Sequence, residues 1–302
     1  MAYLDPSVIS KISRLDLKAK LVVEGFIAGM HKSPFKGYSV EFAQHRGYVA
    51  GDDLKHLDWK VWGKNERFYI KQYEAETNLV CNVLVDASAS MAYVGQGAKN
   101  RMSKLEYAKL VAASLSYLIL NQSDAVAVGM FNQELLGYAQ KSTRKVHIHR
   151  ICKLLEETPP GGTTGVGAIL HTMAERVKRR GIFFVVSDLF EDTEQILKGF
   201  QHLRHGGHEV VVLHVLDDDE LTFPFEGMVQ FKGLEIEELI LCHPRSVRTA
   251  YLEELQKHLN RVKVVCQRNR IDYVLCDTRT PVDVALAAYL AKREHMAAAG
   301  VR

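Results

Sequence analysis

Residues 79–90 read LVCNVLVDASAS, an apolar run that ends abruptly in alternating polar side chains. The run 79–85 is apolar except for Asn82, which predicts a strand buried on both faces, as in the centre of a parallel sheet. Asp86, Ser88 and Ser90 follow at every second position. In an extended turn, alternate side chains point the same way, so these three can face one centre.

Outward from this run, apolar strand-like segments alternate with helical patterns, which is typical of βαβ units. The expected strands are 79–85, 125–131, 181–187, 209–216 and 271–276. The expected helices are 104–120, 146–156, 166–179, 194–204, 247–268 and 282–296. A short segment, 134–140, follows a turn and is expected as an antiparallel edge strand. The pattern predicts an α/β fold with a doubly wound, mostly parallel sheet flanked by helices.

Two regions interrupt this alternation. Residues 1–76 hold an amphipathic helix at about 6–30, a stretch without clear periodicity, and a strand-like run at 67–73. We expect them to form an N-terminal appendage packed on a main domain of 77–302. Residues 217–243 break the main pattern around Phe223-Pro224-Phe225-Glu226-Gly227, which indicates an insertion with a small hairpin.

Composition excludes several classes of protein. The chain has 302 residues, and its 39 basic and 36 acidic side chains nearly cancel, without a block of like charges. No nucleic-acid partner and no direct membrane insertion are therefore expected. The N-terminus lacks a basic stretch followed by an apolar run, and the densest apolar segment, 110–120, is too short to span a bilayer. A cytoplasmic protein is the expectation.

Three polar loops follow predicted parallel strands, where an open α/β sheet places its ligand crevice. They are Asp86-Ala87-Ser88-Ala89-Ser90, Gly161-Gly162-Thr163-Thr164-Gly165 and Ser187-Asp188. Hydroxyl and carboxylate oxygens without His or Cys suit a hard cation, Mg²⁺ first and Mn²⁺ or Ca²⁺ after it. The alternative is that these residues only cap helices and turns.

The three loops, in this order, resemble the metal-ion-dependent adhesion site of von Willebrand factor A domains over residues 79–296. The resemblance implies that Ser88, Ser90 and Thr163 touch the metal directly. It also implies that Asp86 and Asp188 reach the metal through water or hold the hydroxyls in place. Thr163 is preferred over Thr164 because the family's ligand follows the Gly-Gly pair.

A second resemblance covers nearly the full chain. The N-terminal string GYSVEF at 37–42, Gly51-Asp52-Asp53 and Leu57-Asp58-Trp59, together with DASASM and PFEG, resembles the bacterial domain-of-unknown-function fifty-eight family. That resemblance implies an A-type domain that accompanies MoxR-type AAA+ ATPases in the assembly or maturation of other proteins. The Gly51-Asp52-Asp53 segment either binds a cation or basic partner, or pairs with nearby Arg and Lys side chains.

The resulting hypothesis is a metal-dependent protein-binding module rather than an enzyme, in which an acidic side chain of the partner fills the open metal position. Neutral hydroxyl ligands leave the cation much of its charge, which favours such a carboxylate. The alternative is a metal-dependent, phosphatase-like hydrolase in the same crevice, which would need a base or nucleophile near Ser88. A third possibility is a structural scaffold with a vestigial site.

Overall fold

The computed structural model describes residues 14–29, 41–47, 61–63, 68–74, 79–96 and 101–298. The chain divides into two compact units, one of Met1–Pro34 with Val80–Arg302 and one of Phe35–Leu79. This differs from the predicted division after residue 76, because helix α2 (Leu15–Gly29) belongs to the main unit. Ala19, Val22 and Val23 of α2 are buried where the helix packs on α4 (Lys104–Asn121).

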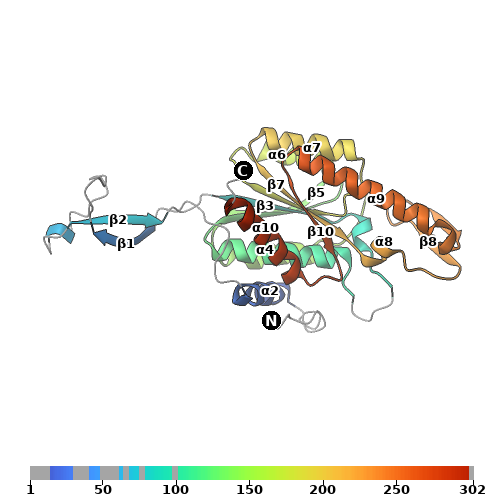
Figure 1. Ribbon diagram of the computed structural model, residues 1–302, viewed down its shortest axis with the longest axis horizontal. Coiled ribbons are helices and arrows are strands. Elements are labelled where there is room, and N and C mark those ends of the chain that lie inside the picture. Colours follow the sequence, from blue (N-terminus) through green and yellow to red (C-terminus); the bar gives the residue numbers. More distant parts are fainter. Residues whose placement is uncertain are drawn as a thin grey trace. The chain divides into compact units, whose positions relative to one another are not determined.

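The main unit is built on a six-stranded sheet in the order β10-β7-β6-β3-β4-β5 (Figure 1). Its strands are β3 (Val80–Asp86), β4 (Ala125–Phe131), β5 (Leu135–Ser142), β6 (Ile182–Ser187), β7 (Glu209–Leu216) and β10 (Asp272–Asp277). All neighbours are parallel except β5, which pairs antiparallel with β4 at the edge. Counted along the chain, the strand order is 3-2-1-4-5-6, the order of a dinucleotide-binding sheet.

Helices cover both faces of this sheet, as Figure 1 shows, and the predicted doubly wound α/β fold is confirmed. One face carries α6 (Val166–Arg176), α7 (Thr193–His205) and α9 (Pro244–Arg268). The other carries α4, on which α2, α5 (His147–Glu157) and α10 (Val282–Ala298) pack. Every residue of β3 and β6 is buried, which explains their continuous apolar sequences.

The core beneath α6, α7 and α9 illustrates why the strands stay in place. Phe183 and Val185 of β6 point into a cluster with Ile169 of α6, Phe200 of α7 and Val262 of α9. All five side chains are buried. Each fully buried side chain of this size stabilises the fold by roughly 1.5–3 kcal/mol. The sheet is thus a rigid platform whose strand ends have fixed positions.

The insertion after β7 contains helix α8 (Asp218–Thr222) and a hairpin of β8 (Val229–Lys232) and β9 (Leu239–Cys242). An aromatic contact joins its base to α9, with 4.6 Å between the ring centroids of Phe223 and Tyr251, and a second, of 5.5 Å, joins Phe223 to Phe231 of β8. Along the hairpin itself most side chains are exposed. The insertion is therefore anchored at its base and loosely packed elsewhere.

The second unit, described by itself, contains an antiparallel pair of strands, β1 (Glu41–Gly47) and β2 (Tyr69–Glu74). A bulge between Phe42 and Gln44 shifts their register. The sequence predicted a strand near β2 but none at β1. The Gly51-Asp52-Asp53 segment lies outside the described residues. None of the described helices is both long and apolar enough to cross a membrane.

The packing of α2 predicts that it contributes to the stability of the main unit. Val22→Ala removes two buried carbon atoms and should lower the free energy of unfolding by about 2 kcal/mol. Leu17→Ala, on the exposed side of the same helix, should have little effect, because Leu17 is 43% exposed. Urea denaturation at equilibrium measures both variants. Equal effects of the two would contradict the assignment of α2 to the main unit.

Candidate metal site at the carboxyl end of the sheet

Two polar loops meet where the strand order reverses, between the parallel neighbours β3 and β6. Asp86 is the last residue of β3, and Ser187 is the last residue of β6, followed by Asp188. The third polar loop, 161–165, comes just before α6. The three predicted loops are therefore together at one edge, as the fold class requires.

The Asp86 carboxylate, which is buried, joins all three loops. Its Oδ1 accepts a hydrogen bond of 2.8 Å from the backbone N–H of Ser88. Its Oδ2 accepts from the hydroxyls of Thr164 at 2.9 Å and Ser187 at 2.6 Å. Both oxygens are thus engaged in holding other residues, which is an orienting role.

The serines of the first loop present their hydroxyls to each other. Ser88 Oγ and Ser90 Oγ lie 3.1 Å apart, and Ser88 is buried at the start of the short 3-10 helix η2 (Ala89–Ala92). Backbone hydrogen bonds between the first and second loops hold them in register, from Ala89 N to Gly162 O at 2.9 Å and from Gly161 N to Ala87 O at 2.8 Å.

Thr164, rather than Thr163, turns its hydroxyl toward Asp86. The Thr163 hydroxyl instead accepts a hydrogen bond from the side-chain amide of Gln133. Gly162, just before the two threonines, has φ of +74°, a left-handed conformation that glycine adopts without strain. The geometry therefore favours Thr164 over the Thr163 preferred from sequence, and the assignment of a direct ligand within this pair stays a prediction.

Asp188 is held by a buried cation that the sequence analysis did not identify. The Lys104 ammonium at the start of α4 lies 2.7 Å from Asp188 Oδ2 and 2.7 Å from Glu220 Oε1 of α8. Burial by itself would lower the pKa of Lys104, but the two carboxylates together raise it. Asp188 is therefore held in an ion pair, which suits an orienting role better than that of an open metal ligand.

His214 of β7 fixes the backbone of the same loop. Its Nε2 lies 2.7 Å from the carbonyl oxygen of Asp188, so Nε2 carries the proton, and its Nδ1 lies 2.9 Å from the Tyr273 hydroxyl. Burial lowers the pKa of His214 to about 4, which keeps the ring neutral at pH 7. Leu189, at φ of +53°, follows in a strained turn closed by its N–H to Ser187 Oγ.

The residues present suit a divalent cation. Burial, with a contribution from the neighbouring Asp188 carboxylate, raises the pKa of Asp86 to about 6. In addition, Glu235 Oε1 is buried without a hydrogen-bond partner beside Thr164, whose N–H lies 3.4 Å from Glu235 Oε2. The first observation reflects the cost of burying the Asp86 charge, and the second is a carboxylate oxygen without a partner among the described residues; a bound cation would stabilise both groups. Within the described ranges no group of three His, Cys, Asp or Glu side chains could hold a metal, so the hydroxyls would have to be ligands.

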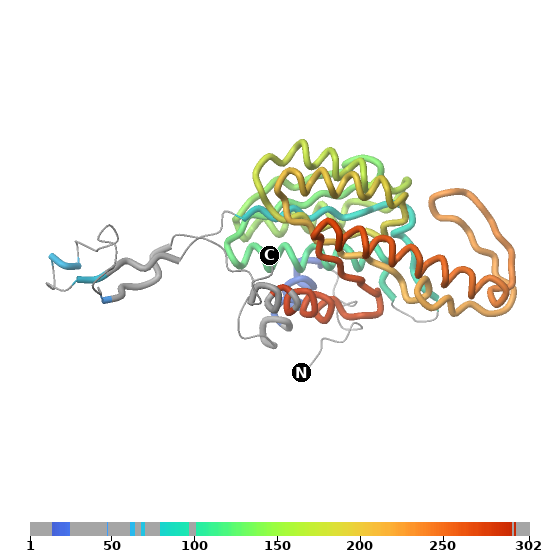
Figure 2. Tube along the Cα trace, turned by 45° about the horizontal axis from the view of Figure 1, so that its top comes forward, coloured from blue at the N-terminus to red at the C-terminus, as the bar shows by residue number. Residues whose placement is uncertain are grey.

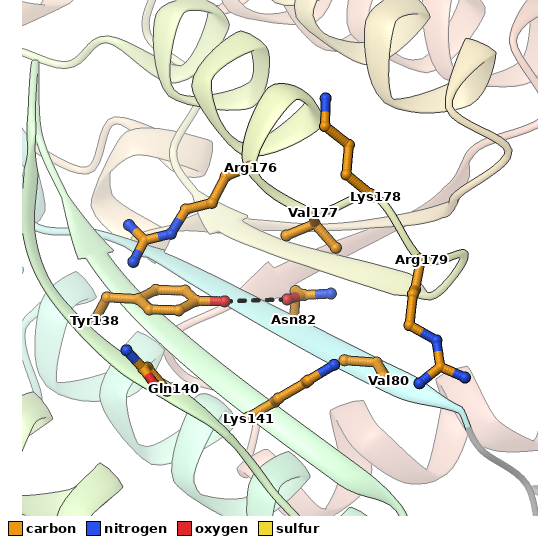
Figure 3. Close-up of a pocket in the computed structure, with 9 residues that line it drawn as sticks. All are labelled: Val80, Asn82, Tyr138, Gln140, Lys141, Arg176, Val177, Lys178 and Arg179. Atoms are coloured by element: carbon orange, nitrogen blue, oxygen red, sulfur yellow. Dashed lines mark hydrogen bonds between the residues drawn. The ribbon is translucent and has the colours of Figure 1, made fainter.

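A separate cavity of about 300 Å³ lies near the amino end of β3 (Figure 3). Tyr138 points across it toward Asn82, with 3.4 Å between the hydroxyl and Oδ1. The charged residues lining it are all cations: Lys141, Arg176, Lys178 and Arg179. Such a lining repels a divalent cation, so this cavity is not a second candidate metal site.

Comparison with known proteins identifies a family. The model of a family described as "Protein of unknown function DUF58" matches residues 44–261. An uncharacterized protein of Mycobacterium tuberculosis, Rv1480, is 24% identical over 236 residues, which are 76% of this chain and 72% of that protein. The protein Mb1516 of Mycobacterium bovis matches to the same extent.

Solved structures with a similar fold include the conserved hypothetical protein BatB from Bacteroides thetaiotaomicron. It is 16% identical, the match covers 72% of this chain and 99% of that one, and the TM-score is 0.46. The SpRpn10 VWA domain is 11% identical over 69% of this chain and 93% of that one, with a TM-score of 0.38. At these values nothing about function follows from the likeness.

The buried ion pair predicts a large effect of removing its cation. Lys104→Met should lower the free energy of unfolding at pH 7 by about 3–5 kcal/mol, because Asp188 and Glu220 are left buried without a counter-charge. Lys153→Met is the control, since its ion pair with Glu157 is exposed. Urea denaturation measures both.

The pH dependence of Lys104→Met follows from Glu220, whose pKa burial already raises despite Lys104. Without that ammonium the pKa rises further, so the folded variant takes up a proton more readily than the unfolded chain. The loss of unfolding free energy in Lys104→Met, relative to the wild type, should therefore be largest near pH 7 and become smaller as the pH falls. A loss that is the same at pH 5 and pH 7 would contradict the buried carboxylate.

Proposed function

This chain belongs to the DUF58 family, and we propose that it is a metal-dependent protein-binding module. The proposed ion is Mg²⁺, or Mn²⁺ or Ca²⁺ in its place, held by the hydroxyls of Ser88, Ser90 and a threonine of the 163–164 pair. Asp86 and Asp188 would orient these ligands and water. The ion would then bind an acidic side chain of a partner protein.

The observation that carries this proposal is the Asp86 carboxylate, which accepts from the Ser88 backbone N–H and from the Thr164 and Ser187 hydroxyls and so holds the three loops together. A hydroxyl that donates its proton to a carboxylate still offers its lone pairs to a cation. A cation held by neutral oxygens keeps most of its positive charge, and an incoming carboxylate is then its strongest available ligand. Binding is thereby favoured over simple structural capping.

Two titratable groups near the proposed ion, His214 and Lys104, also favour binding over hydrolysis, because their polar atoms are already engaged by other residues of the chain. Both ring nitrogens of His214 are hydrogen-bonded, one to the Asp188 carbonyl and one to the Tyr273 hydroxyl, so it is not available as a general base. Lys104 is committed to two carboxylates. A hydrolase would need a base or nucleophile free to meet substrate beside the ion.

The proposed partner is a MoxR-type AAA+ ATPase, or a protein brought to it, as the family resemblance implies. In this proposal the chain acts as an adaptor in protein assembly or maturation. The surface offered to the partner is the carboxyl edge of β3 and β6, because the hydroxyl ligands gather there. The partner contributes one Asp or Glu side chain to the ion.

The first test is calorimetric titration of the purified protein with Mg²⁺ and Mn²⁺. Ser88→Ala should weaken binding by about 10- to 100-fold or more, since losing even an outer-shell group costs that much. Thr164→Val should weaken it similarly, whereas Thr163→Val is the matched control on the adjacent residue. Normal affinity in Ser88→Ala would reject the site, and a loss confined to Thr163→Val would reverse the threonine assignment.

The second test addresses the partner. A MoxR-type AAA+ ATPase should co-purify with the tagged chain in buffer with Mg²⁺, and chelation with EDTA should release it. Ser88→Ala, folded as judged by its thermal unfolding, should fail to retain the ATPase because the bridging ion is lost. Retention by Ser88→Ala would show that the ATPase binds a different surface.

A further inference from the structure

Glu235 lies between β8 and β9, at the tip of the hairpin that the insertion adds to the fold. In Figure 2 the hairpin is the orange loop beyond the N-terminal end of α9. The tip reaches the predicted metal site, since Glu235 Oε2 accepts from the backbone N–H of Thr164 at 3.4 Å. The hydroxyl of the same threonine is bonded to Asp86. Thr164 is thus hydrogen-bonded both to Asp86 and to the hairpin.

The other carboxylate oxygen of Glu235 has an unusual environment. Oε1 is buried and has no hydrogen-bond partner among the described residues. A buried charged oxygen without a partner is costly unless a cation compensates it. Glu191, which accepts from Gly167 N–H nearby, is another carboxylate and adds to the negative charge. No Lys or Arg of the described ranges forms an ion pair with Glu235.

We propose that Glu235 is a built-in ligand of the bound cation and occupies the position that the partner's acidic side chain must take. This inference rests on the proposed function. It turns the hairpin into an internal competitor, because a partner carboxylate reaches the ion only after Glu235 has left. The occupant of the open metal position in the free protein is therefore a residue of the chain itself.

The hairpin is built to release its tip. Its base is anchored by the aromatic contacts of Phe223 with Phe231 and Tyr251. Beyond that base, Ile236, Leu239 and Leu241 are already exposed, so detaching the tip uncovers little further apolar surface. Segments with few buried contacts open at low free-energy cost. Among the described hydrogen bonds of residues 233–238, the one from the Thr164 N–H to Glu235 joins the tip to a residue outside the hairpin.

The tip also supplies a matched control. Glu237 and Glu238 are exposed, whereas Glu235 is partly buried. Glu237→Gln makes the same change of charge two residues away, so a general electrostatic effect on the metal would appear equally in both variants. A ligand effect would appear only in Glu235→Gln.

The test uses Mn²⁺ as the probe with the full chain, measuring affinity by calorimetry and bound water by proton relaxation. Glu235→Gln should weaken Mn²⁺ binding about 10-fold and raise the relaxivity of bound Mn²⁺, because water replaces the carboxylate. Glu237→Gln should match the wild type in both. Sodium acetate, as an external carboxylate, should lower the relaxivity of Glu235→Gln at smaller concentrations than that of the wild type.

Outcomes separate the two proposals. If the wild type binds Mn²⁺ and Ser88→Ala does not, the metal site stands, and equal affinity and relaxivity in Glu235→Gln and Glu237→Gln would overturn the role of Glu235 alone. If the wild type fails to bind Mn²⁺, or Ser88→Ala binds normally, both proposals fail. Hydrogen exchange of the wild type is an independent readout: Mn²⁺ should protect the amides of 233–238, and unchanged exchange would also overturn the inference.

Discussion

The buried carboxylate of Asp86 is the interaction on which the site depends. It sits at the end of a central strand, where the sheet order reverses, and each of its hydrogen bonds fixes a different loop: Ser88 of its own loop, Thr164 before α6 and Ser187 of β6. A charge in this position is expensive, as its raised pKa indicates. Hydrogen bonds to both carboxylate oxygens offset this cost. A bound cation would offset it further. Removing the charge would release three loops at once.

A group of ion pairs connects the candidate site around Asp86 to the insertion. Lys104 bridges Asp188 to Glu220, so one buried ammonium joins the β6 loop, the start of α4 and helix α8. Arg101 adds ion pairs with Asp217 and Asp219 of the same insertion. Ion pairs of this kind add little net stability, but breaking one leaves a buried charge uncompensated. They therefore specify where the insertion begins relative to the site, and that position brings the hairpin tip within reach of Thr164.

The sheet could be predicted from sequence because burial on both faces demands continuous apolar runs, and β3 and β6 have them. The loops could be placed because strand ends in a parallel sheet share one edge. The loop geometry could not be predicted: the Thr164 hydroxyl bonds to Asp86, and whether Thr163 or Thr164 is the direct ligand stays a prediction. Nothing in the sequence singles out Lys104, because its partner Glu220 is 116 residues away. Glu235 reaches the site only through the tertiary path of the hairpin.

In the proposed mechanism, the hairpin lets the site hold its ion and still exchange ligands. A fixed protein carboxylate benefits from proximity, because closing the hairpin costs less entropy than recruiting a free partner. That advantage is limited here, since β8 and β9 bury few side chains and offer little else to hold the tip closed. A partner carboxylate with additional contacts to the carboxyl edge can therefore outcompete Glu235, whereas a small free carboxylate without such contacts is at a disadvantage. Selectivity for a protein over a small anion then follows from the internal ligand rather than from the metal.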